Sequence, residues 1–377
     1  MPNLPRVNLR RPASGSVDVS PGGAVAVAAT TPVRRGLRPS RRTQWFLRRL
    51  AFIPVATLFV ATVAYFLTNL IPSNPERAVL GATATRTAIA REKVLLGLNH
   101  GLIDRYLLYL KALFLHGSLG NSYYGGRAVT ADIAEYLPSS AELAVLGLLV
   151  AMILGITIGT LGAYFLNRPL DRALKAPVVL MLTTPDFFLG LVFTYFMFFK
   201  LGWLPGPTGQ LGLLDPIDNG PTHAALIDSI INGQSGQFSS ALQHAILPAM
   251  TLGISSAAFF MLVTRSTIAR ALTSYQVEFA RACGLPGRKV FAYAFLAART
   301  QIITYIGILF AALVGSDVII EQIFSWGGLG AFFIQRADQL DLPEMEGIAL
   351  VLSLITVAVF LIVDIVVGLL DPRVSYE

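Results

Sequence analysis

Six stretches of the chain each hold enough consecutive apolar residues to cross a lipid bilayer as a helix. A crossing helix needs about 20 such residues, because the hydrocarbon core is about 30 Å thick and an α-helix rises about 1.5 Å per residue. Since lipid offers the backbone no hydrogen-bond partner, these stretches predict an all-α integral membrane protein with about six transmembrane helices. The stretches are approximately 46–71, 140–166, 177–201, 245–264, 302–324 and 347–370. Pro54, Pro185 and Pro248 lie inside them and predict kinks.

The composition indicates lipid-facing surface rather than a large soluble core. Hydrophobic residues make up 54% of the chain and charged residues 14%, against about 25% charged in ordinary soluble domains. The net charge of +7 fits basic flanks of membrane spans, and we expect no nucleic acid as a partner. The single cysteine, Cys283, rules out an internal disulfide, and the four histidines show no i, i+4 pairing, so we expect no metal site.

The distribution of Lys and Arg predicts how the chain is oriented in the membrane. With the N-terminus inside the cell, segments 1–51, 167–176, 265–301 and the tail after 370 are cytoplasmic, and they hold 20 of the 29 basic residues. The segment 321–346 falls outside and carries five acids and one arginine. Because short cytoplasmic loops are enriched in Lys and Arg, this pattern predicts that both termini are cytoplasmic, an N-in/C-in topology.

The segments between the apolar stretches divide the chain further. Residues 1–43 are rich in Pro, Gly, Ser and Arg without periodicity, which predicts a disordered basic tail before a transmembrane domain at 44–374. The long loop 72–139 contains apolar residues at helical spacing around Leu107 and then a short helix expected to end near Pro138. The Gly- and Pro-rich segment 202–245 predicts turns.

The loop 265–301 contains an amphipathic helix-turn-helix that cannot be buried in lipid. We expect one helix from about Ser266 to Cys283, a stop at Gly284, and a second helix after Pro286. Small residues near the turn leave a smooth surface, and Glu278 and Arg281 lie three apart on one face. Two interpretations stand equally on these residues: a docking element for another protein, or an amphipathic helix lying on anionic lipid.

The stretch "EFARACG", Glu278 to Gly284, resembles the Glu-Ala-Ala-x3-Gly signature of ABC importer permeases, with Glu278, Ala280 and Gly284 in place and Phe279 where the first Ala stands. In that family the signature forms a coupling helix that inserts into a cleft of a cytoplasmic ATPase. The resemblance therefore implies that Glu278, Ala280, Arg281, Gly284 and Leu285 dock an ATPase.

Further stretches resemble the dipeptide/oligopeptide/nickel branch of these permeases, in order from about residue 45 to 374. They include "GSLGNSYYGGRAV", "YLPSSAELAVLGLLVA", "TTPDFFLGLVF", "HAILPAMTLGI", "FSWGGLG" and "LLDPRV". The resemblance implies a type I importer permease fold in the cell membrane. It also implies as partners a second permease, two ATPases and an extracytoplasmic solute-binding protein. The chain has no G-x-x-x-x-G-K-[ST] motif, so we expect no enzymatic activity in it and place ATP and Mg²⁺ on the ATPases.

Charged side chains inside a membrane are costly and usually functional, which makes Asp186, Glu142 and Asp317 candidates for lining a translocation path. The simpler interpretation places Glu142 and Asp317 in water at the outer interface. Short peptides are the expected cargo, with nickel chelates, glutathione-like solutes and oligosaccharides as alternatives. A secondary carrier would be expected to show more helices or repeats, and a membrane enzyme a clustered His, Asp or Ser site; the sequence shows neither pattern.

Overall fold

A computed structural model describes residues 41–70, 74–81, 83–215, 220–316 and 318–370, and these residues form helices and connecting loops without a β-strand. Five long helices carry the architecture: α1 (Arg41–Leu70), α5 (Val129–Tyr164), α9 (Ser235–Ala271), α11 (Gly287–Ser316) and α14 (Leu342–Leu370). Two bent pairs are α6 (Pro169–Thr183) with α7 (Asp186–Phe193) and its π-helical extension Thr194–Lys200, and α12 (Val318–Phe324) with α13 (Leu329–Asp338). The short helices are α2 (Pro75–Leu80), α3 (Arg86–Leu95), α4 (Leu102–His116), α8 (Ala225–Ile231) and α10 (Tyr275–Ala282).

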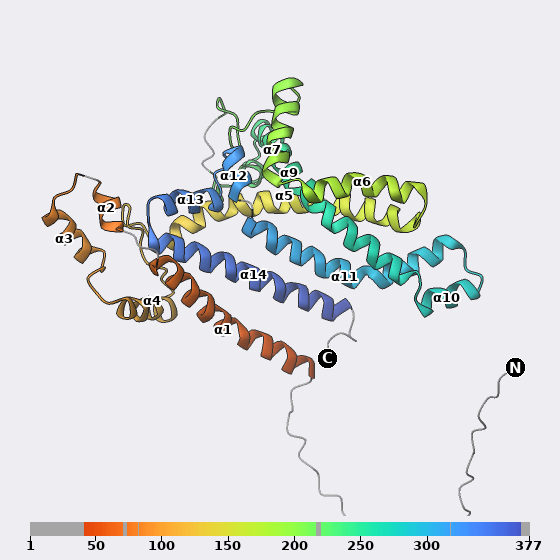
Figure 1. Cartoon of the computed structure of the whole chain (residues 1–377), viewed down its shortest axis with the longest axis horizontal. Coiled ribbons are helices and arrows are strands. Elements are labelled where there is room, and N and C mark those ends of the chain that lie inside the picture. Colours follow the sequence, from red (N-terminus) through yellow and green to blue (C-terminus); the bar gives the residue numbers. More distant parts are fainter. Residues whose placement is uncertain (1–40, 71–73, 82, 216–219, 317, 371–377) are drawn as a thin grey trace, which may run out of the picture. The chain divides into compact units, whose positions relative to one another are not determined.

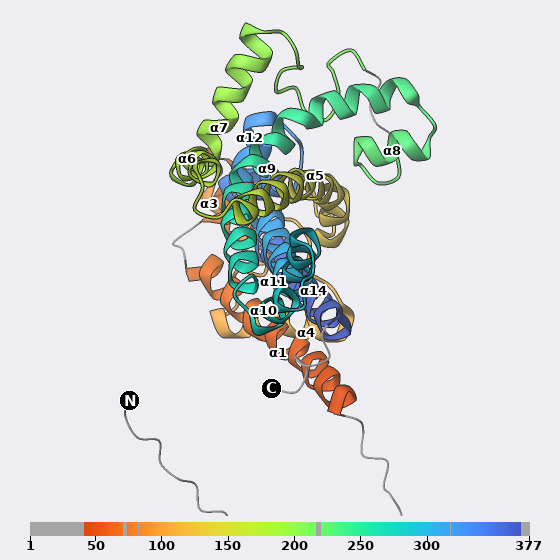
Figure 2. The same ribbon diagram turned by 90° about the vertical axis from the view of Figure 1, so that its right-hand side faces the viewer.

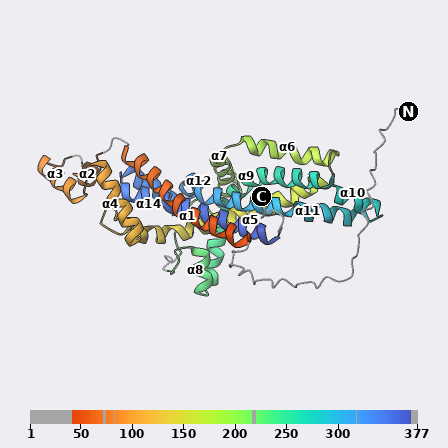
Figure 3. The same ribbon diagram turned by 90° about the horizontal axis from the view of Figure 1, so that it is seen from below.

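Within the described residues, five helices are long and apolar enough to cross a membrane, or seven if each bent pair counts as one span. The prediction of an all-α membrane protein with about six spans is therefore confirmed. Figure 1 shows the long helices running between two ends of the bundle. We call the end that carries α10 the docking end, and the end that carries α2 to α4 the far end; Figure 3 shows the same two ends from below.

The centre of the bundle is the close packing of α5 on α9, and glycines of α5 permit it. A Cβ on Gly159 would stand 2.8 Å from the Cβ of Thr264 and 2.9 Å from the carbonyl oxygen of Met261, distances that real side chains do not reach. A Cβ on Gly155 would meet Phe260, which is fully buried. Small residues let two backbones approach in lipid, where dispersion contacts drive helix association.

The third apolar stretch, expected as one kinked span over 177–201, is broken. Helices α6 and α7 meet at 106°, and α7 turns away from α6 in both side views (Figures 1 and 2). Pro185 has no N–H to continue the helix and holds Thr184 in an extended conformation. The hydroxyls of Thr183 and Thr184 donate to the carbonyl of Leu180 at 2.9 Å and 2.8 Å, so the carbonyl at the break is satisfied.

Other prolines behave differently. Pro54 and Pro248 lie inside the continuous helices α1 and α9. The helix expected to end near Pro138 instead continues through it, and α5 runs from Val129 to Tyr164. The expectation of an end at Pro138 was wrong because one proline removes a single donor from the ladder, while the apolar run that follows keeps the backbone helical.

The loop between α9 and α11 also differs from its prediction. The helix expected from Ser266 to Cys283 is two helices, because α9 ends at Ala271 and α10 starts at Tyr275 after a turn. The hydroxyls of Thr273 and Ser274 donate to carbonyls of the last turn of α9, which favours an end there. The expected second short helix is the start of α11, which enters the membrane without a break. The fifth span is thus 287–316, and residues 318–324 of the predicted stretch 302–324 form α12.

The predicted basic tail 1–43 lies outside the described residues except for 41–43, where α1 already begins.

Candidate functional site

The helix α10 is a short amphipathic helix held at both ends. It follows Ser274, which has the extended backbone of a helix cap, and it ends at Ala282, two residues before Gly284, whose φ of +72° is the left-handed region that favours glycine. The backbone N–H of Leu285 donates to the carbonyl of Ala280 and closes the turn. Val277 and Ala280 are buried against α11, so one face of α10 is fixed to that helix.

The opposite face of α10 is exposed and apolar in its centre. Tyr275 is 91% exposed and Phe279 is 72% exposed, and the two aromatic rings lie one turn apart. They line one side of a surface hollow of about 890 Å³, with Tyr293 and Leu296 of α11 on another side. Solvent-exposed aromatic side chains around a hollow are typical of protein interfaces, where aromatic residues carry much of the binding energy.

The predicted docking residues therefore differ in how far they are exposed to a partner. Glu278, Arg281 and Gly284 are exposed, Ala280 packs inward, and Leu285 is half-buried and lines the hollow. Sequence analysis missed the aromatic side chains Tyr275, Phe279 and Tyr293. Their signal was the i, i+4 spacing of Tyr275 and Phe279, which places both rings on the face opposite Val277 and Ala280.

A buried ion pair holds the end of α9 that leads to α10. Arg265 of α9 makes two hydrogen bonds of 2.7 Å to the two carboxylate oxygens of Asp171 in α6. Asp171 is fully buried and also accepts from the N–H of Asn167 and pairs with Lys175 at 3.2 Å. The planar fork of an arginine matches a carboxylate in this two-bond geometry, which fixes the relative orientation of both helices.

The structure places the predicted path residues in different surroundings. Asp186 stands at the start of α7, exposed beside the break with α6, and accepts a hydrogen bond from Ser255 of α9. Glu142 of α5 is buried and accepts from the backbone N–H of Ile227 at 3.2 Å, so it lies under α8 rather than in open water. Asp317 lies outside the described residues.

The bent pair α12–α13 is tied to the start of α5 by buried polar groups that sequence analysis did not identify. Glu321 is 1% exposed and accepts from the hydroxyl of Ser140 and from the N–H of Ala331, the latter at 2.8 Å. The N–H of Leu329 donates to the same Ser140 oxygen at 2.7 Å. A side chain on Gly328 would collide with Glu321, which explains a glycine at that place of "FSWGGLG".

Trp326 joins this bent pair to the segment after α7. Its indole N–H donates to the carbonyl of Ser139 at 3.0 Å, and its own carbonyl accepts from the side chain of Gln210 at 3.2 Å. The side-chain amide oxygen of Gln210 in turn accepts from the backbone N–H of Ala225 at the start of α8. Three segments distant in sequence therefore share one hydrogen-bonded network.

The loop before α8 is fixed independently by a carboxylate. Asp215 accepts from the hydroxyl of Ser240 and from the N–H of Gly212 at 2.7 Å. These hydrogen bonds, with that of Ser240 contributing most, lower the pKa of Asp215 from its ordinary value, because they stabilise the charged form.

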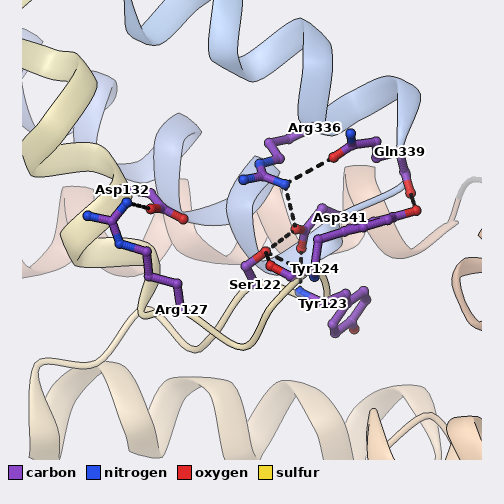
Figure 4. Close-up of polar contacts among 8 residues, drawn as sticks. All are labelled: Ser122, Tyr123, Tyr124, Arg127, Asp132, Arg336, Gln339 and Asp341. Atoms are coloured by element: carbon purple, nitrogen blue, oxygen red, sulfur yellow. Dashed lines mark hydrogen bonds and ion pairs between the residues drawn. The ribbon is translucent and has the colours of Figure 1, made fainter. Parts of the chain in front are cut away.

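A second polar cluster clamps the loop at 122–127 to the junction of α13 and α14 (Figure 4). Asp341 is fully buried and accepts from the hydroxyl of Ser122 and from the N–H of Tyr123, the latter at 3.0 Å. The hydroxyl of Tyr124 donates to the carbonyl of Gln339 at 2.9 Å. The first part of the chain is thereby joined to the last helix at the far end.

Comparison with known proteins identifies the chain. The family model described as "Binding-protein-dependent transport system inner membrane component" matches residues 136–376, and the model of the N-terminal part of such components matches residues 42–144. The chain belongs to this family. It is a permease subunit of a transport system and a multi-pass membrane protein.

Relatives of this permease cover most of its length. A probable D,D-dipeptide transport system permease protein of Escherichia coli is 34% identical over 84% of this chain and 93% of its own. A dipeptide transport system permease protein of Alkalihalophilus pseudofirmus is 30% identical over 88% of this chain and 98% of its own. A glutathione transport system permease protein of Salmonella choleraesuis is 27% identical, with 88% and 99% covered.

The two family models show which part of the permease holds each element of the site. The segment 136–376 holds the broken span α6–α7, the docking-end helix α10 and the bent pair α12–α13. The cluster around Glu321 lies within 136–376, whereas the cluster around Asp341 joins that segment to residues 122–124 of the N-terminal part, in which α1 to α4 also fall.

The buried pair of Asp171 and Arg265 gives a stability prediction. Asp171→Asn leaves the arginine without its carboxylate, and we expect the free energy of unfolding to fall by about 3 kcal/mol, since breaking one partner of a buried pair costs about that much. Thermal unfolding of the purified permease in detergent measures the change.

The double variant Asp171→Asn with Arg265→Met is the matched control. It removes the unpaired charge, so its unfolding temperature should lie closer to that of the parent than the single variant does. A single variant as stable as the parent would show that the ion pair does not hold α9 to α6.

Proposed function

We propose that this permease is one half of the membrane channel of an ATP-driven importer and that α10 is the element a cytoplasmic ATPase grips. The observation that carries the proposal is the exposed aromatic face of α10 beside a hollow, on a helix whose other face is fixed to α11. Of the two interpretations of this loop, docking is favoured. A folded partner can fill such a hollow, whereas a helix adsorbed on lipid presents a convex apolar face.

The continuous α11 supplies the mechanical link in this proposal. Val277 and Ala280 of α10 pack on Val290 and Ala294, and α11 then runs unbroken to residue 316. A displacement of α10 by a closing ATPase dimer therefore moves a helix that crosses the membrane. The ion pair of Asp171 with Arg265 passes the same motion to α6, whose continuation α7 lies beyond the break.

The remaining subunits of the proposed transporter are other chains. We assign ATP and Mg²⁺ to two ATPase subunits, and we expect a second permease to complete the channel and a binding protein to deliver the solute. This arrangement places the docking end in the cytoplasm, in agreement with the N-in/C-in topology predicted from the basic residues.

Short peptides are the proposed cargo. Support comes from the two relatives of at least 30% identity quoted above, both named for dipeptides. The glutathione-named relative keeps glutathione-like solutes as the second candidate. Nickel chelates and oligosaccharides, and at a lower rank a secondary carrier or a membrane enzyme, have no supporting feature among the described residues.

We further propose that Asp186 lines the path of the solute. Its carboxylate is exposed at a break inside the apolar layer, where a charge is costly unless it faces water or a charged group. The positive amino terminus of a peptide is a suitable partner for it. Glu142 and Asp317 remain weaker candidates, since Glu142 contacts α8.

Phe279→Ala tests docking. If the ring fills a pocket of the ATPase, its loss should weaken the affinity of the permease for its ATPase subunits by about 30-fold, the effect of a residue worth about 2 kcal/mol at an interface. Binding of the ATPase to the permease in nanodiscs measures it.

Phe59→Ala is the matched control, because Phe59 of α1 is 69% exposed but lies within a membrane span. We expect this variant to bind the ATPase as the parent does. If the parent and Phe279→Ala bound the ATPase with equal affinity, α10 would not be the docking element.

Asp186→Asn tests the path. We expect uptake of a labelled dipeptide by the complete system to fall about tenfold, as loss of one favourable contact of about 1.4 kcal/mol predicts. Asp104→Asn, which removes an exposed carboxylate of α4, is the control and should transport normally. Unchanged uptake in Asp186→Asn, with the assembled complex verified, would exclude the residue from the path.

A further inference from the structure

Helix α4 lies across the last third of α1, at the far end of the bundle. The hydroxyls of Thr62 and Tyr106 are hydrogen-bonded at 2.6 Å, and the hydroxyl of Tyr65 donates to the carbonyl of Leu102 at 3.0 Å. The ring of Tyr65 also stacks on that of Tyr109 with centroids 5.6 Å apart. These contacts all fall on one turn of α1, between Thr62 and Tyr65, so the two helices meet over a short length.

These contacts set the depth of α4 relative to the apolar span. The span of α1 extends over Ala51–Leu70. Tyr65 and Thr62 precede its end by five and eight residues, which corresponds to about 8 Å and 12 Å at 1.5 Å per residue. An amphipathic helix in a membrane surface sits about 5–10 Å into the boundary between headgroups and acyl chains. The contact of α4 with Tyr65 therefore lies within that depth, and its contact with Thr62 lies just below it.

The exposed side of α4 carries five large apolar side chains, with the charged residues Asp104 and Lys111 among them. Ile103 and Leu107 are each 58% exposed, and Phe114 is 49% exposed. Their spacing of four and seven residues places them in one row along the helix. Leu108 and Leu115, 56% and 70% exposed, form a second row. Water on both rows would be unfavourable, because each of these side chains leaves about half or more of its apolar surface exposed.

The polar residues around α4 have the charge that an anionic lipid surface attracts. Residues 74–116 carry six Lys or Arg side chains and three Asp or Glu side chains. The exposed basic residues are Arg77, Arg86, Arg91, Lys93 and Lys111. Basic residues near a membrane surface are attracted to anionic lipids. Tyr106 and Tyr109 add the aromatic rings that are enriched at this depth.

We propose that α4 is a membrane-surface helix that lies in the leaflet at the far end, with its exposed apolar rows among acyl chains and the basic residues of α2 to α4 at anionic headgroups. It steadies the far end of α1, which is otherwise joined to the bundle mainly through α14. The proposal does not depend on the ATPase or on the cargo.

Fluorescence quenching of a label at Leu107→Cys, in a Cys283→Ser background, tests the proposal. The full chain, purified with the subunits that accompany it, is placed in vesicles of phosphatidylethanolamine and phosphatidylglycerol. Phe59→Cys supplies the lipid-embedded reference, and Leu214→Cys, fully exposed in the loop before α8, supplies the aqueous reference. A nitroxide near the headgroup end of the acyl chain quenches from lipid, and iodide quenches from water.

The lipid nitroxide should quench the label at position 107 at least about half as strongly as the label at position 59, as expected for a surface helix. Replacing phosphatidylglycerol by phosphatidylcholine should reduce that quenching. A label at 107 that behaves like the one at 214 would place α4 in water. A label protected from both quenchers would mean that another protein covers it, and either result would overturn the proposal.

Discussion

The structure depends on one constraint, the need of every backbone N–H and C=O in the apolar layer for a partner within the protein. Unbroken helices meet it in α1, α5, α9, α11 and α14. Where the helices break, side chains provide the hydrogen-bond partners that the backbone has lost. Threonine hydroxyls satisfy the carbonyl of Leu180 before α7, and Glu321 with Ser140 satisfies backbone groups of α13. Such breaks cost stability, so they occur where side chains can supply the missing hydrogen bonds.

The same constraint shapes how motion could pass through the permease. A helix that must remain hydrogen-bonded through the membrane moves as a rigid rod, and α11 begins at the surface on which α10 packs. The bidentate pair of Asp171 and Arg265 joins α9 to α6 near the same end. At the far end, the hydrogen bonds of Trp326 and Asp341 tie loops to α5 and α14. Helices α6 and α9 are thus cross-linked at the docking end, and α5 and α14 are tied to loops at the far end.

Much of the fold followed from sequence because lipid demands length and apolarity, which are visible residue by residue. The number of spans was predicted on that ground, the stop at Gly284 was predicted from the glycine itself, and the family resemblance agreed with the family match. Prediction from proline alone failed, because the tendency of proline to break a helix competes with the tendency of an apolar run to stay helical in lipid. Pro185 broke its helix and Pro138 did not, although both are prolines near apolar runs. The aromatic face of α10 had a local signal that was not used, the spacing of Tyr275 and Phe279, whereas the Glu321 network depends on contacts between distant segments, which no single stretch of sequence contains.

The central claim is that a cytoplasmic ATPase binds α10. The native Cys283 allows a direct test, because it is exposed and lines the hollow beside α10. The measurement is photo-crosslinking from a probe attached to Cys283 before the ATPase subunits are added, with a membrane-impermeant thiol reagent applied from either side before the probe. The account predicts that the reagent blocks Cys283 only from the cytoplasmic side and that the probe crosslinks to an ATPase subunit. Blocking from the outer side, or crosslinks to lipid alone, would contradict it.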